Sequence, residues 1–234
     1  MHANIAVVGH CRLSVGASHT GHLESKGPFD HTTEEMFRAC RADNLASAQA
    51  ALLNGGSLTA VDENGFQPIH VAAAYGRLDL LVWLHEDKDV SIASPSGDGY
   101  QALHIAAAYG HLDVVKWLHG KGASLSDIDS NGGLPIHSAA FHGHIECLKW
   151  LVGMQGVAIT STKHNGEPIH AAAKGGQLLA IQTLHGLGAS LTARDALGGE
   201  PIQYAAAAGH AAVVKWLAEA GVPLTYDRWF EGGV

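Results

Sequence analysis

The chain has 234 residues, of which 47% are apolar and 15% are charged, and its formal net charge is -8. This composition supports a folded core. The absence of any lysine and arginine cluster argues against nucleic-acid binding, and no apolar stretch approaches the roughly 18 residues of a membrane span.

The first 30 residues show no periodicity and are predicted to be a flexible N-terminal tail. The short apolar run Ile5–Val8 has no basic residue before it, so we expect no signal peptide. Cys11, Cys40 and Cys147 form neither a paired spacing nor a zinc pattern. We therefore expect a reducing compartment, the cytoplasm or alternatively the nucleus.

From residue 31 onward one phrase recurs, at spacings of 34, 33, 33 and 33 residues. Its five copies are Pro68-Ile69-His70, Ala102-Leu103-His104, Pro135-Ile136-His137, Pro168-Ile169-His170 and Pro201-Ile202-Gln203. A blurred earlier copy runs from about Thr32 to Asn64, so the period predicts six repeats.

The sequence of each repeat predicts two short helices and a turn. Proline suits the first turn of a helix, and the glycine that follows each small-residue pair suits its end. A second apolar block, such as Leu112–Leu118, predicts the second helix. Turn phrases with Asn-Gly, such as Asp129–Gly132, separate the helix pairs. Such short helices do not persist alone, so the pairs must stack.

The repeated phrase and its period resemble the ankyrin repeat, whose signature is Thr-Pro-Leu-His-x-Ala. The resemblance implies an all-α solenoid of stacked helix-turn-helix units with β-turn or hairpin fingers. We place it at residues 31–230, followed by a C-terminal end at 231–234. The predicted repeats are approximately 32–64, 65–98, 99–131, 132–164, 165–197 and 198–230.

The sequence departs from the signature at two kinds of position. The threonine before proline is replaced by Gln67, Gln101, Leu134, Glu167 or Glu200, all poor helix caps, and the sequence offers no reason for the change. The second and fourth repeats carry one extra residue at the end of the second helix. We expect local bulges at 86–89 and 153–156.

The two ends of the array differ in polarity. The first repeat has polar residues for an outer face, among them Glu34, Arg38 and Gln49, as a terminal repeat requires. The sixth repeat reads like an internal copy. We expect Trp229 and Phe230 to fold back over it; a partner, a dimer contact or further repeats are the alternatives.

The residues that suggest chemistry are explained by the repeat. Histidines at repeat spacing lie about 10 Å apart, too far for two of them to bind one zinc ion through bonds of about 2 Å. We therefore assign the histidines structural roles and expect no metal and no cofactor. The tryptophans Trp83, Trp117, Trp150 and Trp216 share one helix position and are predicted to be core, and Cys40 and Cys147 to be buried and inert. With no nucleophile or phosphate-binding motif, the chain is not expected to be an enzyme.

The resemblance implies that a partner protein binds the concave face, on turn tips and exposed first-helix residues. Ten residues occupy those positions: Phe66, Tyr75, Tyr100, Tyr109, Phe141, His142, Lys163, His164, Lys174 and Arg194. They suggest an aromatic middle and a basic flank suited to an acidic or amphipathic segment. The other interpretation is that they are scattered exposed rings without function.

Three classes of function remain open. The leading one is a non-enzymatic adaptor, scaffold or inhibitor that acts as a monomer, with no small-molecule ligand. The second is a structural protein that self-associates through its sixth repeat. The third is a metal or small-molecule binder that uses histidine.

Overall fold

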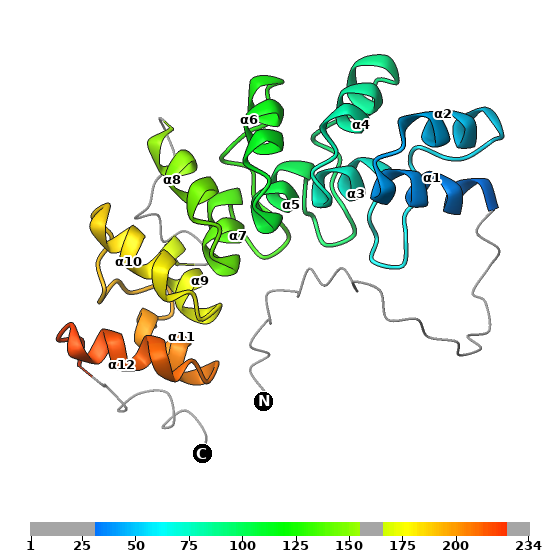
Figure 1. Ribbon diagram of the computed structural model, residues 1–234. Helices are drawn as coiled ribbons and strands as arrows, with labels where there is room; N and C mark the ends of the chain where they lie inside the picture. Colours follow the sequence, from blue (N-terminus) through cyan, green and yellow to red (C-terminus); the bar gives the residue numbers. More distant parts are fainter. Residues whose placement is uncertain (1–30, 155–165, 224–234) are drawn as a thin grey trace, which may run out of the picture. The chain divides into compact units, whose positions relative to one another are not determined.

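The computed structural model describes residues 31–154 and 166–223, and over these residues the secondary structure is helical, with no strand (Figure 1). The contacts divide the chain into two compact units, Met1–Ala102 and Leu103–Val234. Nothing in the sequence predicted this division. No described helix is long and apolar enough to cross a membrane. The expected N-terminal tail lies outside the described residues.

The first unit contains two helix pairs. These are α1 (His31–Ala42) with α2 (Leu45–Leu53), and α3 (Pro68–Ala74) with α4 (Leu78–Val82). Helix α4 continues without a break as a π-helical turn, Trp83–Asp87. Helix α1 packs against both α2 and α3, so the two pairs stack through their first helices.

The second unit contains four pairs. They are α5 (Ala102–Tyr109) with α6 (Leu112–Gly120), α7 (Pro135–His142) with α8 (Ile145–Gly153), α9 (Pro168–Lys174) with α10 (Leu178–Gly186), and α11 (Pro201–Ala207) with α12 (Ala211–Glu219). First helices pack on first helices (α7 on α9, α9 on α11), and second helices on second helices (α6 on α8, α8 on α10). The predicted stacking of short helix pairs is confirmed within each unit.

The boundaries of the first helices follow the predicted residues. Proline begins α3, α7, α9 and α11. After each first helix from α3 onward stands a left-handed glycine with φ of 68° to 78°: Gly76, Gly110, Gly143, Gly176 and Gly209. Gly110 is needed for a second reason, because a Cβ there would overlap the ring of His144 from the following pair.

Three of the described finger turns are closed by an aspartate side chain, and a fourth by the hydroxyl of Ser96, which accepts the N–H of Tyr100 at 3.1 Å. The N–H of Asp62 donates to the carbonyl oxygen of Phe66 at 2.8 Å, and Gly65, with φ of 75°, donates back to Asp62 at 2.9 Å. The Asp62 carboxylate accepts the N–H groups of Asn64 and Phe66 at 2.9 and 3.0 Å. Asp129 and Asp195 hold their turns in the same way, so the predicted turns are confirmed.

Small side chains let the stacked helices approach closely. The pairs Ala106-Ala107, Ala139-Ala140 and Ala172-Ala173 are fully buried, as are the apolar residues of the second helices at Val115, Leu148 and Ile181. Burial of this kind supplies the main stabilisation of such stacks.

One of the two predicted bulges is confirmed. The π-helical turn Trp83–Asp87 absorbs the extra residue, and the N–H of Val90 reaches back to Leu84, one residue farther than the N–H of Ala123 reaches to Leu118. A π turn is what one inserted residue produces in a helix. At the second site α8 ends at Gly153, and residues 155 and 156 lie outside the described residues.

The end pairs differ as predicted. Glu34, Arg38 and Gln49 of the first pair are exposed. In the last pair Ala206 and Ala207 are exposed instead. Trp229 and Phe230, which were expected to cover this end, lie outside the described residues.

Candidate functional site

A histidine ring accepts the backbone N–H of the residue before proline. In three first helices the residue before proline donates its backbone N–H to the Nδ1 of the histidine three positions later: Gln67 to His70 (3.0 Å), Leu134 to His137 (3.1 Å) and Glu167 to His170 (3.0 Å). In α11 the carboxamide oxygen of Gln203 accepts the N–H of Glu200 in the same way, at 2.9 Å. The N–H that a threonine cap would accept donates instead to the backbone carbonyl oxygen of the residue before proline: His70 donates to Gln67 and His137 to Leu134, both at 2.9 Å.

The other ring nitrogen of each histidine binds the next finger. Because Nδ1 accepts a hydrogen bond, the proton is on Nε2, which donates to a carbonyl oxygen. The recipients are Ser94 for His70 (2.8 Å), Gly166 for His137 (3.1 Å), and Ala193 and Gly199 for His170 (3.0 and 3.1 Å). Each ring therefore fastens the start of one helix to the finger that follows it.

Burial favours the neutral form of three of the repeated histidines. It lowers the pKa of His70, His104 and His137 below the ordinary value. The carbonyl contacts and the nearby Asp62 or Asp129 oppose this effect only in part. Both ring nitrogens of His70 and His137 are occupied within the protein, so these rings serve structure.

In three places a side chain that stands just before a second helix binds the end of the first helix of the preceding pair. The Nε2 of His144 contacts the carbonyl oxygen of Ala108 at 2.8 Å, and that of His210 contacts Lys174 at 2.9 Å. In the first unit the guanidinium of Arg77 donates to Arg41 at 3.0 Å. These carbonyls lie in the last turn of their helices, where no intrahelical N–H remains to bind them.

The third periodic set closes the second helices. The Nδ1 atoms of His85, His119 and His185 lie 3.1, 3.3 and 3.0 Å from the carbonyl oxygens of Val90, Ala123 and Ala189. The described part of the chain contains no cluster of three metal-ligating side chains.

Cys40 and Cys147 are buried, as predicted. Cys40 and Cys147 are free thiols. Burial raises the pKa of Cys40 to about 12 and, together with Asp113 and Glu146, that of Cys147 to about 11. The thiolate is the reactive form of cysteine, and these values disfavour it.

The prediction that all four repeated tryptophans are core is wrong for three of them. Trp83 is buried, but Trp117, Trp150 and Trp216 are only half-buried. They lie on the second helices, where a ring can rest against the neighbouring helix and keep one edge in solvent. Trp150, for example, meets the ring of His119 edge-on at 5.7 Å.

Two of the ten predicted binding residues are not at the surface. Phe66 and Tyr100 are only 5% and 7% exposed. Each follows a finger glycine and turns inward beneath its finger, where the ring of Phe66 lies 6.0 Å from that of His70. The finger needs this apolar support, so the prediction that these rings are exposed is wrong.

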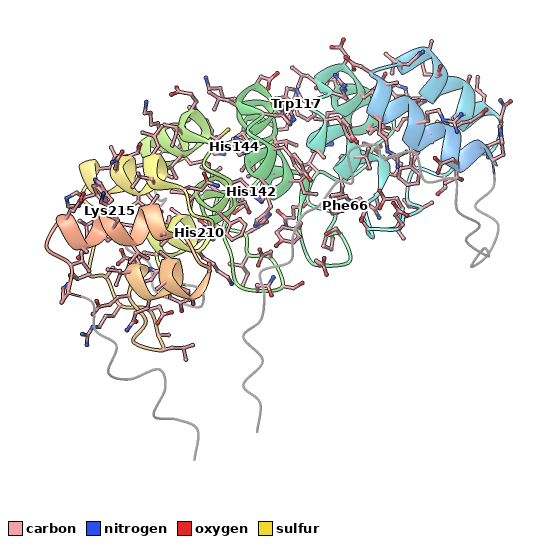
Figure 2. All side chains as sticks on the ribbon, turned by 60° about the horizontal axis from the view of Figure 1, so that its bottom comes forward. Phe66, Trp117, His142, His144, His210 and Lys215 are labelled. Carbon is pink, nitrogen blue, oxygen red and sulfur yellow. The ribbon has the colours of Figure 1, made fainter. Side chains whose placement is uncertain are left out.

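Four of the predicted aromatic residues are half-exposed at the ends of first helices: Tyr75, Tyr109, Phe141 and His142. Phe141 and His142 meet edge-on at 5.0 Å, and the ring of His142 stacks on that of His144 at 6.3 Å (Figure 2). The second unit thus brings Phe141, His142 and His144 together. In the first unit the guanidinium of Arg77 lies 6.0 Å from the ring centre of Tyr75.

The predicted basic flank is weaker than expected. Arg194 is exposed, but its guanidinium is bound by Glu200 at 2.9 Å, which compensates its charge. Lys174 is half-buried, and burial lowers its pKa. Lys163 and His164 lie outside the described residues.

The search of the sequence for aromatic residues missed exposed aliphatic ones. Ile128 and Leu197, on two fingers of the second unit, are 55% and 81% exposed, and Val61 occupies the position of Ile128 on a finger of the first unit. The sequence contains a feature that could have predicted them. Each stands beside a finger aspartate or glycine, where the turn leaves no neighbour to cover it.

Comparison with known proteins agrees with the repeated architecture. One family model, described as ankyrin repeats in three copies, matches residues 69–163 and 136–227. Another, described as ankyrin repeats in many copies, matches residues 36–85. A search of curated proteins finds no match.

Proposed function

Because the chain belongs to the ankyrin repeat family, whose repeats generally mediate protein–protein binding, we propose that it is a non-catalytic adaptor, scaffold or inhibitor that holds a partner protein. The partner contacts two rows of side chains in the second unit. One row stands at the ends of the first helices (Tyr109, Phe141, His142 and Lys174), and the other on the fingers (Ile128 and Leu197). We call the two rows together the binding strip.

The observation that carries this proposal is the presence of large rings where the fold accepts small residues. Phe141 and His142 occupy the positions that Ala207 and Ala208 occupy in the last pair, which folds in the same way. The fold does not require rings at the ends of the first helices. A partner that covers these half-exposed rings buries a large area of them.

The middle of the first helices supports a close approach by a partner. Between the two rows, α7 and α9 present Ser138 and Ala171, which are small and half-exposed. A backbone or a helix can therefore approach the strip without a steric barrier.

The charges refine the chemistry of the partner. With Arg194 compensated by Glu200, the basic character of the described strip is reduced to the region of Lys174. The partner is then an amphipathic segment whose apolar side meets Phe141 and Ile128 and whose acidic group lies near Lys174.

The test compares a variant of the binding strip with a control variant whose substitution lies outside the strip. In the first, Tyr109→Ser and Phe141→Ser remove both strip rings. In the control, Leu179→Ser removes an apolar side chain that is 61% exposed on α10, outside the strip. Both are used to capture proteins from an extract of the source cells, with quantitative mass spectrometry as the readout and circular dichroism as the check on folding.

A partner retained by the control and lost by the strip variant supports the proposal. Hydrogen exchange of the purified complex should then show protection over α7. Equal capture by both variants would refute the strip as the binding surface.

A further inference from the structure

The last helix pair presents an apolar face on the side away from α9 and α10. An open hollow of about 360 Å³ lies on it, lined by Ala206, Gly209, His210, Ala211, Val214, Lys215 and Ala218. We call this surface the end face. Figure 2 labels two of its residues, His210 and Lys215.

The end face has the composition of a stacking interface. Ala206 is exposed and Val214 half-exposed, whereas the residues at the same positions in the two preceding pairs are fully buried: Ala140 and Ala173, and Leu148 and Ile181. In those pairs the next pair covers them, because α7 packs on α9 and α8 on α10. The end face is therefore apolar surface suited to stacking that no described element covers.

The apolar residues of α12 form one stripe. Ala211, Val214 and Ala218 recur at spacings of three and four residues, which places them on one side of the helix. Their small size allows a second helix to approach closely.

One edge of the same stripe carries a lysine and a glutamate, so it is complementary in charge to the same edge of a second copy. Lys215 and Glu219 are one helical turn apart, with Nζ 3.8 Å from Oε1, and their side chains are 78% and 64% exposed. When two identical helices pack antiparallel about a twofold axis, each edge faces the same edge of the other helix in reverse order. If the axis passes midway between the two residues, Lys215 faces Glu219 of the second copy, and Glu219 faces Lys215 of the second copy.

From these observations we propose that a second copy of this chain covers the end face, α12 against α12, to form an antiparallel homodimer. The self-complementary order of the charges along this edge favours a second copy over an unrelated partner. The end face shares no residue with the binding strip, so the dimer does not depend on the function proposed above.

The test is sedimentation equilibrium of the full chain over a range of concentrations. We expect the wild type to dimerise. Val214→Glu should abolish the dimer, because it places a charge in the centre of the stripe. Leu179→Ser, on α10, should leave the dimer unchanged, and circular dichroism checks that each variant is folded.

Charge reversal tests the antiparallel geometry directly. Lys215→Glu and Glu219→Lys, each alone, place like charges opposite one another and should weaken the homodimer by roughly tenfold. The double variant should recover the wild-type affinity. A mixture of the two single variants should form a heterodimer more strongly than either variant pairs with itself.

Three results would overturn the proposal. The first is a wild type that stays monomeric at all concentrations, and the second is a double reversal that fails to recover affinity. The third is that the wild type and the Val214→Glu variant are both monomeric while the variant has the lower melting temperature. This result would mean that the chain covers its own end face. The Tyr109→Ser, Phe141→Ser variant should dimerise normally, which separates this test from that of the binding strip.

Discussion

A single histidine ring performs two tasks at the start of a first helix. His137 accepts the N–H of Leu134 at 3.1 Å and donates to the carbonyl oxygen of Gly166 at 3.1 Å. The ring thus joins the residue before the helix to the following finger. A threonine cap would accept the N–H of His137, which donates instead to the carbonyl oxygen of Leu134 at 2.9 Å. This helix start therefore forms without threonine at position 134.

Acid should destabilise the protein through these rings. The pKa of His70, His104 and His137 is lowered by burial, so the unfolded chain binds protons more tightly than the folded one. Their contribution is complete above the unfolded pKa of about 6.5 and falls as pH drops below it, by up to about 1.4 kcal/mol per pH unit for each ring. We expect the melting temperature to fall from pH 7 to pH 5.

The control for this prediction is already present in the chain. Gln203 occupies the histidine position of α11, accepts the N–H of Glu200 at 2.9 Å and does not titrate in this range. A variant with glutamine at positions 70, 104 and 137 should show a flatter decline. The raised pKa of Glu167 acts with the opposite sign and cannot produce the loss. An equally steep decline in the variant would contradict the prediction.

At the scale of the element, second helices share one way of ending. Gly55, Gly122, Gly188 and Gly221 follow α2, α6, α10 and α12 with φ of 88° to 103°. After the π-helical turn the same place is held by Asp89, with φ of 55°. An aspartate tolerates the left-handed region less well than glycine.

Asp89→Gly should therefore stabilise the first unit by about 1 kcal/mol, because it relieves this conformation. The mirror substitution Gly122→Asp, in the second unit, should destabilise by a similar amount. Urea unfolding followed by circular dichroism measures both. If Asp89→Gly lowered the stability, the contacts of the Asp89 side chain would stabilise the fold by more than its left-handed backbone conformation destabilises it.

At the scale of the whole molecule, each unit carries one buried thiol among its described residues. Cys40 lies in α1, whose pair stacks on one side within its unit, against α3. Cys147 lies in α8, which is packed between α6 and α10. Stacked repeats lose their ends more readily than their interiors, because an end has only one neighbour.

Cys40 should become accessible to a thiol reagent at a lower urea concentration than Cys147. The measurement is labelling at graded urea, read by mass spectrometry, on a Cys11→Ser chain so that only these two thiols respond. Cys40→Ala and Cys147→Ala assign each signal. Simultaneous labelling would show instead that both units unfold in one cooperative step.

Local chemistry explains which predictions from sequence were confirmed. Proline at a first helical turn and glycine at a left-handed position act through their own backbone, so the repeats and helix ends were readable without a structure. The extra residue near Glu86 was likewise visible as a shift in spacing, and it appears as the π-helical turn.

The candidate site was less predictable, because exposure and charge depend on neighbours that are distant in sequence. Phe66 and Tyr100 were expected at the surface and are buried beneath their fingers. Arg194 was expected to provide charge and is bound by Glu200. Ile128 and Leu197 are more exposed than any of the predicted rings that the structure describes, and neither was predicted to lie in the site.

By itself the sequence determined the family, the period, the helix pairs and their turns, because these follow from residues that act within one repeat. Only the tertiary structure decided which rings remain accessible, which charges are compensated, and that the face of α11 and α12 lacks a described neighbour. Each of these depends on contacts between side chains brought together by stacking, and a linear pattern does not contain them.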